Sequence, residues 1–321
     1  MFKNSKAKKL SESRKDFIMK RKLTYILLMT VTLMLFIAGC SNGGKEQGEE
    51  NKQSGEKEKI RFVIGPYQPT PQDTRTAFEP FIKHVAQELG VDYEMAVTND
   101  WAGIAVALST GQADVAWMGP WSYVLSYHQA DVEALATVKY DGKPTYQAII
   151  VANPEVEIEN FPEDAKGMSI SFADVGSTSG WLVPSYYFHT LGINPKEYFQ
   201  YTEGATHPAN EISVIEGTVD LATDYDRNRN AMLLAGTINE NDNKIVWESD
   251  PLPNDPIVVR KNLDADLKKK MQEVIVAIDE STAKEVLPEH YTGFVKSSHE
   301  MYKMIEDAGI ALEKIDTNEQ K

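Results

Sequence analysis

Residues 168–192 read MSISFADVGSTSGWLVPSYYFHTLG, and this stretch predicts a short strand that leads directly into a helix. Met168–Phe172 is typical of a strand, and Gly180–Leu191 is typical of a helix. Between them lies the polar run Ser177-Thr178-Ser179, which follows the strand and immediately precedes the helix. A strand followed by a helix is the repeating unit of layered α/β proteins.

The same alternation extends in both directions from this unit. Strands are predicted at 60–64, 91–97, 114–118, 132–138, 146–151, 199–202, 219–223, 244–247 and 256–260, with helices at 78–89, 209–215, 227–234 and 266–278 between several of them. A turn-rich acidic segment at 153–167 separates two such series. We therefore predict two α/β lobes with a ligand cleft between them, because ligands of such folds lie where strand ends and helix N-termini meet a crevice.

The predicted boundaries follow from these breaks. The first lobe is expected at residues 60–152 and the second at 153–249. Residues 250–321 are expected to return to the first lobe and to end in helices. The chain would then cross between the lobes twice, near Asn153 and near Pro251.

Three consecutive hydroxyl side chains at a predicted helix start point to anion binding. Ser177, Thr178 and Ser179 offer O–H donors beside backbone N–H groups that have no partner within the helix, at the positive end of its dipole. The alternative is an ordinary N-cap, which requires only one Ser or Thr. Local sequence leaves both interpretations open.

Composition excludes several classes of protein. The chain has 321 residues, with 48 acidic against 33 basic side chains, and a single cysteine. One cysteine excludes a disulfide scaffold, a cysteine-based zinc site and an iron–sulfur cluster. A formal net charge of −15 argues against nucleic acid as a partner, because such proteins need a basic face to replace phosphate counterions.

Residues 1–39 have the features of a signal peptide. Lys20-Arg21-Lys22 precedes an apolar stretch from Tyr25 to Ala38, which is too short for a typical membrane span. Met19 begins a more ordinary signal sequence than Met1 does, so either methionine could be the start. The next segment, residues 40–59, contains the cysteine and then a polar sequence typical of a flexible tether.

Ile37-Ala38-Gly39-Cys40 resembles the lipobox of bacterial lipoproteins. The resemblance implies that Cys40 is diacylated and becomes the first residue after cleavage. The protein would then be anchored by lipid to the cell membrane on its extracytoplasmic face. The alternative is an ordinary signal peptide with an incidental cysteine.

Gly176–Tyr187 resembles the signature of the phosphonate-binding proteins of ABC importers, within the phosphate, phosphite and phosphonate branch of the periplasmic binding proteins. Further segments match that family in order over residues 60–290: 100–104, 113–119, 141–146 and 251–258. The resemblance implies a two-lobed type II periplasmic-binding-protein fold that captures a solute and does no catalysis. It implies no cofactor and no metal, a monomer, and an ABC permease with its ATPase as partners.

The resemblance also implies a set of ligand-binding residues. The hydroxyls of the Ser-Thr-Ser run would bind the phosphonate oxygens, and a histidine would donate a further hydrogen bond. Trp101 stands where the family has a Tyr, and Asp255 matches an acid that faces the amino group of 2-aminoethylphosphonate-type ligands. The implied site is Ser177, Thr178, Ser179, His207, Trp101, Tyr146, Asp255, Asp226 and Arg227. Without the resemblance, the histidine, the two aromatic residues and Asp255 would more simply be structural.

One position departs from the family pattern. Arg227 aligns with a second acid of the members that bind aminoalkyl ligands. Asp224 and Asp226 are close enough in sequence to take the place of that acid. If neither does, a cation at this position disfavours an ammonium and favours a more anionic ligand.

Other functions remain as alternatives. Within solute capture, phosphite, phosphate, a sulfonate and a thiamine-precursor-like pyrimidine compete with a phosphonate such as 2-aminoethylphosphonate. A sensor lobe that presents its ligand to a signalling protein is a second class. A hydrolase or transferase is a third, but the sequence has no metal-ligand cluster and no Gly-x-Ser-x-Gly elbow.

Overall fold

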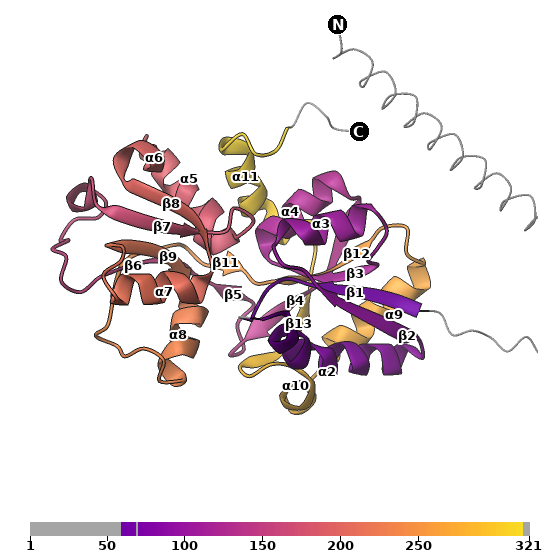
Figure 1. Cartoon of the computed structure of the whole chain (residues 1–321). Coiled ribbons are helices and arrows are strands. Elements are labelled where there is room, and N and C mark those ends of the chain that lie inside the picture. The colour runs from indigo at the N-terminus through magenta and orange to yellow at the C-terminus, as the bar shows by residue number, and fades with distance from the viewer. Residues whose placement is uncertain (1–58, 69, 317–321) are drawn as a thin grey trace, which may run out of the picture. The chain divides into compact units, whose positions relative to one another are not determined.

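The computed structural model describes residues 59–68 and 70–316 (Figure 1). The predicted signal peptide, Cys40 and nearly all of the predicted tether lie outside these residues. Among the helices of the described part, none combines the length and the apolar character that crossing a bilayer requires.

A six-stranded sheet forms the first lobe. Its strand order is β13-β4-β12-β3-β1-β2, in which β1 pairs in parallel with β2 and β3, and β12 and β13 pair antiparallel to their neighbours. The strands are β1 (Lys59–Ile64), β2 (Asp92–Val97), β3 (Val115–Trp117), β4 (Val132–Tyr140), β12 (Pro256–Arg260) and β13 (Tyr291–Lys296). The helices of this lobe are α2 (Pro71–Leu89), α3 (Ala102–Ser109), α4 (Pro120–Gln129), α9 (Ala265–Val276) and α10 (Glu280–Val286).

A five-stranded sheet forms the second lobe, in the order β10-β6-β9-β7-β8. The strands are β6 (Ala148–Ala152), β7 (Ser169–Ala173), β8 (Gln200–Ala205), β9 (Leu221–Tyr225) and β10 (Lys244–Glu248). The helices are α5 (Val183–Thr190), α6 (Pro195–Tyr198), α7 (His207–Ile215) and α8 (Asp226–Leu234). The described part of the chain also contains three single turns: the 3-10 turns Glu163–Ala165 and His299–Tyr302, and the π-helical turn Thr178–Leu182.

Each sheet is buried on both faces, as the side-chain alternation of its strands requires. In β1, Phe62 and Ile64 point into the core under α2 and α9, whereas Val63 points into the core under α3 and α4. In β6, Ile150 and Val151 divide in the same way between two cores of the second lobe. The predicted α/β architecture is confirmed.

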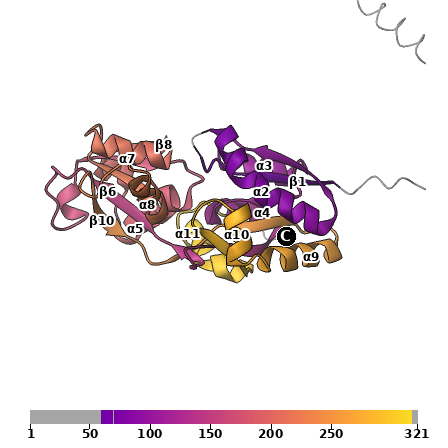
Figure 2. The same cartoon turned by 90° about the horizontal axis from the view of Figure 1, so that it is seen from below.

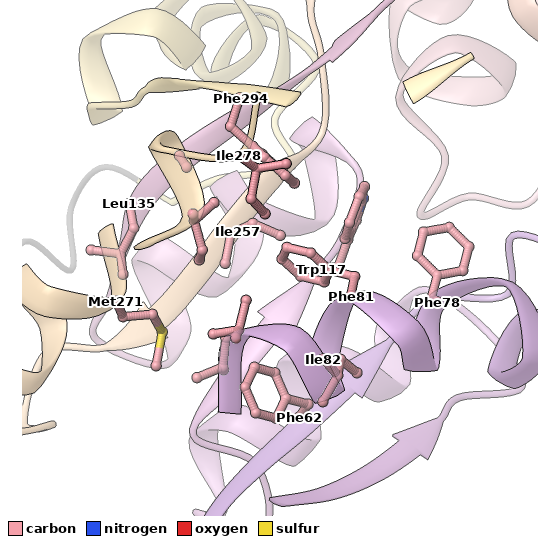
Figure 3. Close-up of a cluster of buried hydrophobic side chains, with 14 of the residues drawn as sticks. Phe62, Phe78, Phe81, Ile82, Trp117, Leu135, Ile257, Met271, Ile278 and Phe294 are labelled. Atoms are coloured by element: carbon pink, nitrogen blue, oxygen red, sulfur yellow. The ribbon is translucent and has the colours of Figure 1, made fainter. Parts of the chain in front are cut away.

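In the larger core of the first lobe, several aromatic side chains pack around Trp117 (Figure 3). The ring of Trp117 meets Phe78 at 4.9 Å, Phe81 at 5.2 Å and Phe294 at 5.6 Å, in each case edge to face. Burying each such phenylalanine side chain contributes roughly 1.5–3 kcal/mol to stability. These contacts fix the strands whose ends and loops line the first lobe's side of the cleft.

Two chain crossings join the lobes, and they are hydrogen-bonded to each other. The first crossing contains β5 (Thr145–Tyr146) and the second contains β11 (Leu252–Pro253), which pair antiparallel between the two sheets (Figure 1). Ser249 strengthens the junction, because its hydroxyl accepts from the N–H of Ala148 at 3.0 Å. The two crossings therefore form one short ribbon.

The structure corrects the predicted position of the first crossing. We expected it near Asn153, but β6 ends at Ala152 and already belongs to the second sheet. The turn-rich segment after β6 is a loop within the second lobe. A turn signal marks the end of a strand but does not reveal which sheet the strand has joined.

The C-terminal part adds one strand, β13 (Tyr291–Lys296), to this plan and ends in a helix, α11 (Lys303–Ala311), as predicted. β13 was not among the predicted strands, and it carries Gly293 at φ 114°, a residue that weakens a strand signal. Helix α11 contacts α4 of the first lobe and α5 of the second (Figure 2). The C-terminal helix thus adds a third connection between the lobes.

Candidate functional site

A pocket of about 380 Å³ lies between the two lobes. The first lobe and the crossings contribute the loop after β1, the start of α3, the start of α4, Tyr146 and Asp255. The second lobe contributes the loop after β7 and the N-terminal ends of α7 and α8. This is the position expected for a ligand in an α/β fold, at strand ends and helix N-termini.

The predicted hydroxyl run lines this pocket. Ser177 precedes the π-helical turn, and its Oγ accepts from the N–H of Gly180 at 3.1 Å. The predicted single helix is therefore a π turn followed by α5, a local geometry found often at functional sites. The side chains of Ser177, Thr178 and Ser179 are all buried although their residues line the pocket.

The N-cap interpretation accounts for only part of this run. Ser177 does cap the turn, but the Oγ1 of Thr178 instead accepts from the N–H of Trp121 in the first lobe at 2.8 Å. Ser179 lies beside the hydroxyl of Tyr146. Capping by Ser177 thus leaves two further hydroxyls in the pocket wall, and these can serve an anion.

Close packing requires glycine at position 180. A Cβ there would lie 2.3 Å from the Cβ of Ala173 and 2.7 Å from the Cε1 of His207. Since both are fixed groups, a larger residue would displace the turn or the histidine. Gly180 therefore allows the hydroxyl run and His207 to approach each other.

His207 joins the hydroxyl run to a buried acid. It is the first residue of α7, with Nε2 3.0 Å from the Oγ of Ser177 and Nδ1 2.9 Å from Oδ1 of Asp224. Burial lowers the pKa of His207 to about 4, although Glu211 and Asp174 favour its charged form. Near neutral pH the ring is therefore neutral, with Asp224 as the natural acceptor for an Nδ1 hydrogen.

Two acids behind His207 were not predicted as part of this arrangement. Burial raises the pKa of Asp224 to about 7, and burial together with Asp224 raises the pKa of Glu211 to about 9. Asp224 is not among the residues that line the pocket, and Asn228 donates to its Oδ2 at 2.9 Å. Asp224 therefore orients His207. The sequence had left open that Asp224 meets a ligand's ammonium, but the side chain does not reach the pocket.

Arg227 lies in the pocket wall at the start of α8, surrounded by aromatic rings. Its Cζ lies 4.7 Å from the ring centroid of Tyr146 and 5.5 Å from that of Tyr225. Its Nη2 lies 3.6 Å from Oδ2 of Asp255. Arg227, Asp255 and Tyr146 are thus brought together as predicted, with Tyr225 as an addition that the sequence analysis did not name.

Asp226 does not join them. It is absent from the residues that line the pocket, and its Oδ1 accepts from the N–H of Arg227 at 2.8 Å. A carboxylate at a helix N-terminus is stabilised by the free N–H groups and the dipole there. The predicted ligand contact of Asp226 is therefore not supported, because the side chain serves its own helix.

Trp101 lies at the start of α3 and is held by two glycines. A Cβ at Gly65 would lie 2.4 Å from its ring, and a Cβ at Gly176 would lie 2.6 Å from its own Cβ. Gly65 follows β1 in the first lobe and Gly176 follows β7 in the second. The indole also meets Tyr67, another pocket residue, at 5.0 Å in a T-shaped contact. Trp101 is therefore part of the wall where the lobes meet.

Across residues 59–68 and 70–316, no three or more His, Cys, Asp and Glu side chains gather in a way that could hold a metal ion. Cys40, the predicted lipidation site, lies outside those residues. The polar side chains that line the pocket are hydroxyls, amides, one neutral histidine, one arginine and the carboxylates of Asp100, Asp174 and Asp255. Such a set can bind an oxyanion by hydrogen bonds and charge.

Comparisons with known proteins agree with this geometry. Residues 62–302 match the family model described as "ABC transporter, phosphonate, periplasmic substrate-binding protein". The chain is 30% identical over 204 residues to the phosphonates-binding periplasmic protein of Escherichia coli K12, which covers 62% of this chain and 60% of that protein. It is 24% identical over 249 residues to the phosphate-import protein PhnD of Mycolicibacterium smegmatis, covering 74% of this chain and 77% of that protein.

A solved structure extends the likeness to the fold. It is the binding-protein component of an ABC phosphonate transporter from Pseudomonas aeruginosa, with a TM-score of 0.71 and 26% identity. The match covers 80% of this chain and 88% of that one, and it confirms the type II periplasmic-binding-protein fold. The chain therefore belongs to the family of periplasmic phosphonate substrate-binding proteins of ABC transporters, a family that binds solutes and is not enzymatic.

Proposed function

We propose that this protein captures a phosphonate on the extracytoplasmic side of the cell membrane and delivers it to an ABC permease driven by an ATPase. The observation that carries the proposal is the pairing of the hydroxyl run with His207 in one buried pocket wall. Ser177 and His207 lie 3.0 Å apart, and both residues line the cavity between the lobes. Hydrogen-bond donors at a helix start favour a tetrahedral oxyanion.

The proposed contacts are specific. The hydroxyls of Ser177, Thr178 and Ser179 would donate to the phosphonate oxygens, together with the first N–H groups of the π turn. His207 would complete the set from α7. The arrangement supports a phosphonate headgroup and leaves part of the 380 Å³ pocket for a substituent.

Calorimetric titration tests the ligand class. The purified protein would be unfolded and refolded to remove carried ligand, then titrated with methylphosphonate, 2-aminoethylphosphonate, phosphonoacetate, phosphite, phosphate and an alkylsulfonate. We expect a phosphonate to bind most tightly. A preference for phosphite or phosphate over every phosphonate would replace the proposed ligand with an inorganic oxyanion, and no binding to any compound would reject the oxyanion site.

We further propose that a lipid on Cys40 anchors the protein, on the basis of the lipobox-like sequence. In this arrangement the polar residues that follow would let the lobes work in water beside the permease. Cell fractionation tests the anchor. Cys40→Ala should move the protein from the membrane fraction to the soluble fraction, and an unchanged distribution would contradict lipid anchoring.

A further inference from the structure

The pocket contains a second polar cluster that the binding of a phosphonate headgroup does not use. It consists of Arg227, Asp255 and Tyr67, all of which line the cavity. The rings of Tyr140, Tyr146, Tyr225 and Tyr291 surround the guanidinium, with centroids 5.2, 4.7, 5.5 and 6.0 Å from its Cζ. We call this group of seven residues the arginine cage.

The guanidinium of Arg227 is a permanent cation at the centre of the cage. Arg227 is only 8% exposed. Burial by itself lowers the pKa of Arg227, but Tyr291 and Asp255 outweigh that effect and the net shift is upward. A second cation entering the cage would face a like charge, and the four tyrosine faces that attract cations are already occupied.

The unpartnered hydrogen-bond donors of the cage outnumber its unpartnered carboxylate oxygen. Nε and Nη1 of Arg227, the hydroxyl of Tyr67 and Oδ2 of Asp255 are buried and have no hydrogen-bond partner in the described part of the chain, so three donor atoms stand against one acceptor atom. Asp255 is the carboxylate beside these donors. Burial raises the pKa of Asp255, whereas the neighbouring groups Arg227 and Tyr67 act to lower it. Buried donors without acceptors are unfavourable, so an acceptor on a ligand would be favoured here.

One tyrosine connects the cage to the hydroxyl run. The hydroxyl of Tyr146 lies beside Thr178 and Ser179, while its ring packs against the guanidinium of Arg227. The two parts of the pocket are therefore separated by about one tyrosine side chain. A phosphonate with a short substituent can reach from one to the other.

We infer that the arginine cage selects phosphonates whose short substituent ends in a hydrogen-bond acceptor such as a carboxylate, and rejects those that end in an ammonium. The inference rests on the proposed phosphonate-binding function and specifies its substrate class. Arg227 is the residue that determines this choice. It supplies the charge that repels an ammonium, and its unpartnered N–H groups can donate to an acceptor on the ligand.

Three ligands with the same headgroup test the inference in the unmodified protein. Phosphonoacetate carries a carboxylate, 2-aminoethylphosphonate carries an ammonium, and methylphosphonate carries neither. By calorimetry we expect phosphonoacetate to bind at least ~10-fold more tightly than 2-aminoethylphosphonate, the change that one charge-assisted hydrogen bond produces. Methylphosphonate should fall between them.

Two variants and a control assign the preference to Arg227. Arg227→Met should bring phosphonoacetate to the affinity of methylphosphonate, and Arg227→Glu should make 2-aminoethylphosphonate the tighter ligand. Lys284→Glu changes the net charge as Arg227→Glu does, on a side chain that is 74% exposed and lies on α10 outside the pocket lining. This control should keep the order of the unmodified protein. Circular dichroism would verify that each variant is folded.

The outcomes separate this inference from the proposed function. If methylphosphonate binds but 2-aminoethylphosphonate binds as tightly as phosphonoacetate, the function stands and the inference is wrong. If phosphonoacetate is preferred equally in the unmodified protein and in folded Arg227→Met, Arg227 is not the selecting residue. If none of the three ligands binds the unmodified protein, the proposed function itself fails. The unmodified protein decides the ligand preference even if both variants misfold.

Discussion

Anion binding beside Ser177 should draw a proton onto His207. In the free protein the neutral ring faces Asp224 through Nδ1, so its Nε2 is an acceptor for the hydroxyl hydrogen of Ser177. In that state neither group offers a hydrogen to an oxyanion. Protonation of Nε2 makes His207 a donor, to Ser177 or to the oxyanion itself, and the hydroxyl hydrogen of Ser177 becomes free for the ligand.

The magnitudes favour protonation in the complex. With a pKa of about 4 in the free protein, charging His207 at pH 7 costs about 4 kcal/mol, at 1.36 kcal/mol for each pH unit. A doubly charged oxyanion about 4 Å from the ring contributes about 8 kcal/mol at an effective dielectric constant of 20. Glu211 and Asp174 favour the charged ring as well, whereas Arg227 opposes it. The ligand's contribution exceeds the cost, so the bound form holds the extra proton.

The amount of proton uptake follows from Asp224. Because its pKa is about 7, Asp224 already carries a proton in part of the free molecules at neutral pH. Binding should therefore take up roughly half a proton to one proton at pH 7, approaching one at pH 8. Since the complex holds more protons than the free protein, this term makes affinity fall as pH rises. Glu211 stays protonated in this range, because its pKa is about 9.

Calorimetry in buffers of different ionisation enthalpy measures this uptake directly. Methylphosphonate would be titrated into the unmodified protein and into His207→Gln, which keeps an N–H donor but does not titrate. The ligand's own ionisation is common to both, so their difference reports His207 alone. We expect the unmodified protein to take up roughly half a proton to one proton more than the variant. Equal uptake by the two proteins would refute the reasoning.

Three further predictions test the site and the fold. Ser177→Ala should weaken methylphosphonate binding by about 1–3 kcal/mol in calorimetry, because an anion loses a buried donor, and unchanged affinity would remove Ser177 from the site. Phe81→Ala should lower the free energy of unfolding by about 3–5 kcal/mol in urea, since its ring is buried against Trp117, and a loss below about 1 kcal/mol would contradict that packing. Asp114→Asn should lower it by about 1.5–3 kcal/mol at pH 7. Arg61 and Arg260 outweigh burial and lower the pKa of Asp114, so this stabilisation is present above the ordinary pKa and is lost as pH falls below about 4. An equal deficit at pH 3 and pH 7 would show that the Asp114 charge is not responsible.

Local sequence was most informative about short segments whose residue types by themselves indicate a structure. The Ser177–Ser179 run after a strand predicted a helix start with free donors, and the structure places that run in the pocket wall. The π turn at Thr178–Leu182 could not be foreseen, because it depends on the close approach of Gly180 to Ala173 and His207. Those residues come from three different elements.

The neighbours of His207 and Arg227 show the limit of sequence reasoning. Asp224 and Asp226 are two residues apart, and both were candidates to meet a ligand's ammonium. In β9 and α8 they face different surroundings, so Asp224 supports His207 whereas Asp226 accepts from the N–H of Arg227 in the first turn of its own helix. Direction in space, which alternates along a strand and rotates along a helix, decided their roles.

The sequence alone determined the α/β alternation, the hydroxyl run Ser177–Ser179 and the presence of Arg227 at the start of α8. These properties depend on the spacing and chemistry of residues that are near in the chain. Only the tertiary structure decided that Tyr140, Tyr146, Tyr225 and Tyr291 gather around Arg227, and that the chain first crosses between lobes before β6. Such contacts depend on how strands from distant parts of the chain pair, because pairing brings together side chains whose separation in sequence carries no local signal.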